Sequence, residues 1–309
     1  MLLITSVIDN LLKSFENTFS RETQQIVHDS YEGTFKALFE SNIIPDVIRT
    51  DLEFTLEKIS EYKIIYLPFQ IVMRKNVAEI LKKYVRSGGT LVADARTAII
   101  DEYDFAYAKN PGAGLTELFG VTRIDHTGKD GSFNVTITDP SVFVNVTRGD
   151  SFKGVYFREE WKLSDGTKTI ATYDNGSPAL AMNSYGKGTA ILSGVPLGAS
   201  YLDDENNDVN RIIAGLALKS GAGQDALLEP ERPKDMTTYL HQSENASYIY
   251  VINSSEYDYT GKLTFKGLQK AKEIKNIIND QKIAFENTNE NLFMNISIPA
   301  FKAGIFRIE

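Results

Sequence analysis

Ile64-Ile65-Tyr66-Leu67, followed by Pro68, opens the stretch of sequence that decides the fold. This short apolar run is typical of a strand buried on both faces of a parallel sheet. Apolar residues then recur at helical spacing over residues 77–85, and Gly88-Gly89 ends the predicted helix, because glycine readily adopts a positive φ. Thr90-Leu91-Val92-Ala93 is a second β-rich run. A strand, a helix and a strand at this spacing predict a right-handed parallel crossover, so the chain is α/β here.

A loop follows the second of these strands, from Asp94 to Asp104. Loops at the carboxyl ends of parallel strands are where α/β folds place binding groups. This loop carries the carboxyl groups of Asp101, Glu102 and Asp104, and Arg96 could pair with one of them and hold the loop. A sugar-facing or intersubunit role for these residues is the alternative.

Similar patterns predict the elements around this stretch. Strands are expected at residues 1–7 and 45–49, helices at 26–39, 115–119 and 209–218, and a hairpin with strands at 179–182 and 189–192. Between residues 121 and 173 the hydrophobic period changes to two, as in 133–137 and 142–146. This period predicts antiparallel strands at the edge of the α/β sheet.

Glycine and proline mark a domain boundary at residues 221–233. We assign residues 1–224 to the α/β domain. Residues 234–309 contain short strands at even spacing, which predicts a small antiparallel β-sandwich.

Composition narrows the classes of function. The 309 residues are 42% hydrophobic and 24% charged, as in ordinary globular proteins. A net charge of -8 and a pI near 5.1 argue against nucleic acid as a partner. No run approaches the length of a membrane span, and the absence of cysteine removes disulfides, thiolate nucleophiles and cysteine metal sites. We therefore expect no cofactor, no metal, no membrane partner and a cytoplasmic location.

Several short motifs occur in an order known from one protein family. They are YVRSGGTLV at 84–92, DEYD at 101–104, PG at 111–112, LTELFGV at 115–121, GSPA at 176–179 and GKGTA at 186–190. In this order they resemble the trimerisation domain of glycoside hydrolase family 42 β-galactosidases. The part from Thr237 onward is similar to the C-terminal β domain of the same family, so the resemblance covers nearly the whole chain.

The resemblance implies a flavodoxin-like domain of the class I glutamine amidotransferase type, followed by the small β-sandwich. Family members begin with a catalytic (β/α)₈ barrel that carries two glutamates, and this chain lacks that barrel. The implied function is the non-catalytic oligomerisation and scaffold part of a β-galactosidase-like hydrolase of carbohydrate metabolism. The implied partners are further copies, forming a trimer, or a separate barrel subunit.

We assign no catalytic residue. The amidotransferase nucleophile is a cysteine, but Ala93-Asp94-Ala95 follows the relevant strand. A serine elbow of the Gly-x-Ser-x-Gly type is also absent from the sequence. Glu159 and Glu160 are adjacent on a predicted strand, so they point to opposite faces and make a poor pair for glycoside hydrolysis. A small hydrolase on the flavodoxin-like domain remains an alternative function.

Two further features have a structural and a functional interpretation. Trp161 is expected to pack in the β region, because large rings mostly supply buried area; the alternative is a sugar platform in a carbohydrate-binding or sensing module. The acidic run 203–208 lacks the glycine and terminal glutamate of a calcium loop. We interpret this run as a helix cap and not as a metal site.

Overall fold

The computed structural model describes residues 2–5, 21–50, 54–204, 208–223, 226–230, 233, 235–243, 246–266, 268 and 271–309. The chain divides into two compact units, and each is described by itself below. The first unit comprises Met1–Leu38 and Pro45–Ala222, and the second comprises Phe39–Ile44 and Gly223–Glu309. None of the described helices has the length and apolar character needed to cross a membrane.

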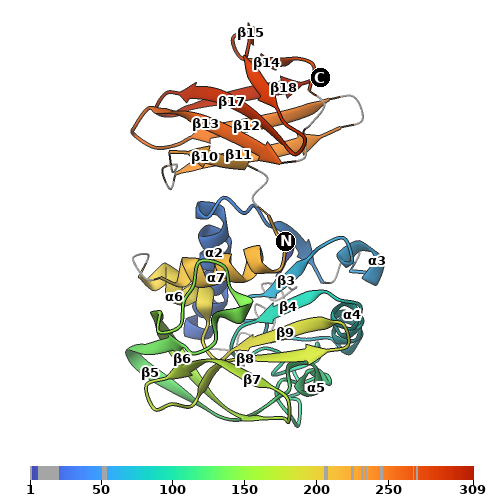
Figure 1. Ribbon diagram of the computed structural model, residues 1–309. Helices are drawn as coiled ribbons and strands as arrows, with labels where there is room; N and C mark the ends of the chain where they lie inside the picture. The colour runs from blue at the N-terminus through green and yellow to red at the C-terminus, as the bar shows by residue number, and fades with distance from the viewer. Residues whose placement is uncertain are drawn as a thin grey trace. The chain divides into compact units, whose positions relative to one another are not determined.

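The described part of the first unit is built on a nine-stranded mixed sheet in the order β2-β1-β3-β4-β9-β8-β7-β5-β6 (Figure 1). Its parallel strands are β1 (Leu2–Thr5), β2 (Asp46–Arg49), β3 (Ile64–Leu67), β4 (Thr90–Ala93) and β9 (Gly188–Ser193). β3 pairs with β4 in parallel, with Ile64 opposite Thr90, and β4 pairs in parallel with β9. The predicted crossover and the α/β class are therefore confirmed.

The remaining strands of this sheet are antiparallel. They are β5 (Val121–Ile137), β6 (Ser151–Leu163), β7 (Lys168–Tyr173) and β8 (Pro178–Tyr185). β8 and β9 form the predicted hairpin, with Tyr185 opposite Gly188. Gly186 in its turn has a φ of 63°, which glycine adopts without steric cost.

One predicted strand is wrong. Residues 142–146 alternate in hydrophobicity, but Pro140–Val142 form a 3₁₀ turn (η1) and the chain then continues as a loop. The N–H of Val144 donates to the carbonyl oxygen of Gly215 at 3.1 Å, and Val146 is buried. The segment is therefore a loop packed against a helix, and its buried residues, Phe143 and Val146, do not follow a period of two.

Helices cover both faces of the sheet. They are α2 (Arg21–Glu40), α3 (Leu56–Ile59), α4 (Lys75–Arg86), α5 (Leu115–Phe119), α6 (Leu197–Asp203) and α7 (Val209–Lys219). Figure 1 shows α4 and α5 on one side of the sheet and α6 and α7 on the other. The sequence patterns predicted most of these helices but did not predict α6.

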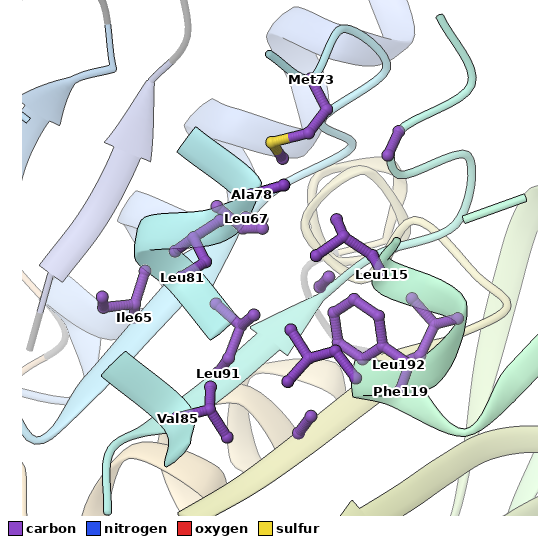
Figure 2. Packing of buried hydrophobic residues seen from close by; sticks show 14 of the residues in the cluster. Ile65, Leu67, Met73, Ala78, Leu81, Val85, Leu91, Leu115, Phe119 and Leu192 are labelled. Carbon is purple, nitrogen blue, oxygen red and sulfur yellow. The ribbon is translucent and has the colours of Figure 1, made fainter. Parts of the chain in front are cut away.

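The core beside α4 explains why this stretch decides the fold. Leu81 and Val85 of α4 face Ile65 of β3 and Leu91 of β4, while Phe119 of α5 closes the same cluster (Figure 2). All of these side chains are fully buried. Burying one such side chain stabilises a protein by roughly 1.5–3 kcal/mol, so the helical spacing and the strand runs specify one another.

The second unit contains two antiparallel sheets with one core between them, the arrangement of a β-sandwich. One sheet has the order β10-β13-β17-β16 and the other β11-β12-β18-β14-β15. Their strands are β10 (Ala226–Glu229), β11 (Met236–Gln242), β12 (Ser247–Asn253), β13 (Tyr259–Lys266), β14 (Ile274–Asn276), β15 (Gln281–Lys282), β16 (Phe285–Asn287), β17 (Asn291–Ile298) and β18 (Lys302–Ile308). Ile249 and Phe306 from one sheet share the core with Leu263 and Leu292 from the other.

The second unit also includes parts that the sequence did not assign to it. β10 lies within residues 221–233, which were predicted to be a linker. Asn42 belongs to this unit as well: its amide donates to the carbonyl oxygen of Ala226 and accepts from both the N–H and the hydroxyl of Thr238. Satisfying a buried amide in this way ties the segment 39–44 to β10 and β11.

Candidate functional site

The carboxyl end of β4 carries a buried carboxyl group. Asp94 is fully buried and accepts a hydrogen bond from the Tyr66 hydroxyl at 3.0 Å. Burial raises the pKa of Asp94 well above its usual range, although Tyr66 and the N–H groups of Leu197 and Gly198 favour the ionised form. Its Oδ2 atom has no hydrogen-bond partner of good geometry. A carboxyl group that is buried and held this way is a structural element of the sheet edge and not a nucleophile.

The stability of Asp94→Asn relative to the wild type is expected to increase as pH rises. The pKa of Asp94 is raised in the folded chain. Above the unfolded-state pKa near 3.9, the folded chain therefore keeps a proton that the unfolded chain has lost. Wild-type stability therefore falls with pH up to the folded pKa, by at most about 1.4 kcal/mol per pH unit, while asparagine does not titrate. Urea unfolding of both proteins between pH 4 and pH 8 measures this difference. A difference that does not change with pH would show that the pKa of Asp94 is not raised in the folded chain.

A second buried carboxylate, Glu159 on β6, holds the loop after β4. Glu159 Oε1 accepts from the backbone N–H of Arg96 at 2.9 Å, and Oε2 accepts from Trp161 Nε1 at 3.1 Å. Arg123 Nη1 lies 3.8 Å from Oε1, which forms a buried ion pair. Burial raises the pKa of Glu159, opposed by these donors and by both arginines. The network fixes the loop on the antiparallel part of the sheet.

The side chain of Arg96 lies beside β6. Its guanidinium group lies over the ring of Phe157, 5.7 Å from the ring centroid, and its charge interacts with the charges of Arg123 and Glu159. Among the ion pairs between described residues, none joins Arg96 to Asp101 or Glu102. Arg96 also has a φ of 64°, an uncommon conformation for a residue with a side chain.

Trp161 is a core residue. It is 7% exposed, it packs in the same cluster as α4 and α5, and its ring nitrogen donates to Glu159. Buried in this way, the indole ring has no open face on which a sugar could stack. The structural interpretation of Trp161 therefore agrees with its position, and the sugar-platform role stays a prediction without geometric support.

Residues 101–105 form a compact turn. Asp101 Oδ1 accepts from the N–H groups of Tyr103 and Phe105, both at 2.9 Å, and the Asp101 N–H donates to the Phe105 carbonyl oxygen at 3.0 Å. Tyr103 and Phe105 are 72% and 71% exposed. Glu102 and Asp104 are half-buried neighbours in the same turn. Sequence reasoning selected the carboxylates of this turn but overlooked its two aromatic residues, which the DEYDF pattern displays.

The acidic run 203–208 lies only in part within the described residues, which exclude 205–207. Asp208 pairs with Arg211 at 3.1 Å at the start of α7. Across the described part of the chain, no group of three or more metal-binding side chains comes together.

Comparison with known proteins identifies the family. The family of β-galactosidase trimerisation domains matches residues 12–212, which is more than half of the chain. The chain belongs to this family. The resemblance to the trimerisation domain of family 42 is thereby confirmed.

Individual relatives agree with this assignment. The chain is 26% identical to β-galactosidase Pbg of Clostridium perfringens over 251 residues, which cover 78% of this chain and 33% of that protein. It is 23% identical to β-galactosidase GalA of Bacillus licheniformis over 289 residues, covering 89% of this chain and 37% of that protein. The chain thus spans about a third of the length of these relatives.

Solved structures show the same fold. The β-galactosidase from Bacillus circulans sp. alkalophilus superposes on 99% of this chain with a TM-score of 0.74 at 19% identity, and the match covers 41% of that chain. The GH42 β-galactosidase Gan42B of G. stearothermophilus, in a catalytic mutant, gives a TM-score of 0.72 and covers 40% of that chain. Both units of this chain therefore have counterparts in solved β-galactosidases.

Proposed function

We propose that this chain is the non-catalytic oligomerisation and scaffold part of a β-galactosidase-like glycoside hydrolase. The observation that carries the proposal is the match of residues 12–212 to the β-galactosidase trimerisation domain, together with coverage of only 33% of a curated β-galactosidase. The chain would act in carbohydrate metabolism by assembling copies around catalytic parts that it does not itself supply.

The finer fold assignment is also a proposal. The parallel strands follow the order β2-β1-β3-β4-β9, which is the strand order of flavodoxin-like doubly wound sheets. This order supports a flavodoxin-like domain of the amidotransferase type that has gained an antiparallel extension, β5 to β8. Asp94 at the end of β4 stands where an amidotransferase would carry its cysteine, so the fold is used without that chemistry.

The described carboxyl groups at this end of the sheet favour a scaffold over a small hydrolase. Asp94 is paired with the Tyr66 hydroxyl, and Glu159 is paired with Trp161, Arg123 and the backbone of Arg96. A nucleophile needs a base within hydrogen-bond reach and access to substrate. Both groups are instead buried and engaged in holding neighbouring elements.

Oligomer formation is the partner hypothesis that the family description supports, and we propose a homotrimer. A separate barrel subunit is the second candidate partner. A stand-alone carbohydrate-binding or sensing module is the alternative function, and it depends on the loop with Arg96 and residues 101–104, because Trp161 is buried. We also propose a cytoplasmic location, which the acidic composition favours.

Size-exclusion chromatography with light scattering on this chain tests the proposal. The expected result is a mass three times that of the 34.5 kDa chain, with no hydrolysis of nitrophenyl-galactoside. A monomer at every concentration would contradict the oligomerisation role and direct the search to a barrel subunit. Calorimetric titration with galactosides separates the alternative, since only a sugar-binding module would release heat.

A further inference from the structure

The first unit exposes an aromatic pair that its own fold does not use. Only Val47, Tyr103 and Phe105 are exposed large apolar residues among its described residues, and the last two are by far the most exposed. They sit two positions apart in one turn. Burial of apolar surface gains about 25 cal/mol for each Å² removed from water, so a partner that covered both rings would gain free energy.

The turn presents these rings on a fixed backbone. Asp101 holds the N–H groups of Tyr103 and Phe105, and the base of the turn is closed by a bridge between Ile100 and Ala106. Tyr107, two residues after Phe105, anchors the end of the turn, because its hydroxyl donates to the Met73 carbonyl oxygen at 2.7 Å. A surface that is ordered before binding loses little conformational entropy on association.

The charge of the turn indicates what faces it. Asp101 and Glu102 directly precede the two aromatic residues, so the turn is acidic as well as aromatic. A second copy of the same turn would repel it, because like charges would then be brought together. Charge complementarity therefore favours a different, cationic surface on the partner.

The same unit carries a cationic surface at the other end of β4, formed by Lys83, Arg86 and Lys187. All three are exposed, and the N–H of Lys187 donates to the Arg86 carbonyl oxygen at 3.0 Å. The guanidinium group of Arg86 lies over the Tyr185 ring at 5.1 Å and donates to its hydroxyl. None of these three cations forms an ion pair within the described residues.

We propose that the 101–105 turn of one copy docks on the Lys83, Arg86 and Lys187 surface of a second copy. This inference rests on the proposed oligomerisation function and deepens it by naming the two surfaces. A contact between two different surfaces is heterologous, and repeating it produces a closed ring when the rotation between copies permits. A cyclic trimer requires a heterologous contact of this kind, because an isologous contact related by a two-fold axis closes after two copies.

Charge reversal on both surfaces tests the proposal. Glu102→Lys alone and Lys83→Glu/Lys187→Glu alone are expected to weaken self-association by about tenfold or more, because each brings like charges together. Combining the three substitutions in one chain is expected to restore association. Tyr103→Ala/Phe105→Ala removes the apolar contact and is expected to weaken association at least as much. Sedimentation velocity over a concentration series measures each variant.

Lys162→Glu/Lys168→Glu is the matched control, since it reverses two exposed cations on β6 and β7 outside the proposed surfaces. An assembled wild type whose association is unaffected by the turn and Lys83/Lys187 variants would overturn the docking proposal alone and leave the oligomerisation function standing. The turn would then contact another partner, such as a barrel subunit. A wild type that is monomeric throughout would overturn both.

Discussion

Glu159→Ala is expected to lower the free energy of unfolding of the first unit by about 3 to 5 kcal/mol, because it removes one partner from a buried ion pair. The substitution leaves the Trp161 ring nitrogen and the Arg96 N–H without acceptors. It also leaves the charge of Arg123, whose side chain is 14% exposed, without its counter-ion. Urea unfolding followed by circular dichroism measures the loss and avoids the direct effect of the substitution on the fluorescence of Trp161.

Glu160→Ala is the matched control on the next residue of the same strand. Glu160 pairs with Arg158 at 3.4 Å and its side chain is 43% exposed, so the substitution is expected to cost at most about 1 kcal/mol. Glu159→Gln should fall between the two, because glutamine keeps one acceptor oxygen but not both. Equal stabilities for the two alanine variants would show that the Glu159 network does not hold the loop.

The elements that sequence predicted well are those whose own pattern decides their structure. β3 and β4 are short apolar runs that are buried on both faces, and α4 buries a stripe at helical spacing, so local pattern and tertiary packing agree. The hairpin at Gly186 was predictable for the same reason, because the turn chemistry is local. Residues 142–146 also alternate in hydrophobicity, but they form a loop beside α7, and local spacing cannot distinguish such a loop from a strand.

The candidate site was less predictable, because its partners are distant in sequence. Glu159 meets Arg96 across 63 positions, and no spacing rule links them. The sequence did predict that Glu159 and Glu160 would face opposite sides, since strands alternate, but it could not show which one is buried. The loop carboxylates were visible as a cluster, whereas the exposure of Tyr103 and Phe105 depends on how the turn folds.

The contact between α2 and α6 was also invisible in sequence, because it depends on two glycines. A Cβ atom built at Gly198 would overlap the carbonyl oxygen of Ser30 on α2, and one built at Gly33 would overlap the carbonyl oxygen of Gly198. The hydroxyl of Thr34 already donates to Ser30, at 2.7 Å. The two backbones therefore touch, and no side-chain rotation can relieve an added methyl group.

Gly198→Ala is expected to destabilise the first unit by about 3 kcal/mol or more, at the upper end of the usual cost of overpacking, because the obstacle is backbone. Alanine gains roughly 0.5–1 kcal/mol over glycine inside a helix, which is too little to offset this cost. Trp161 is the only tryptophan and is buried in this unit, so its fluorescence in urea measures the loss. Gly223→Ala, in the second unit, adds a Cβ that meets no atom within 4 Å, so it should leave the unfolding transition of the first unit unchanged within about 0.5 kcal/mol. If Gly198→Ala proves as stable as this control, α2 and α6 do not meet through their backbones.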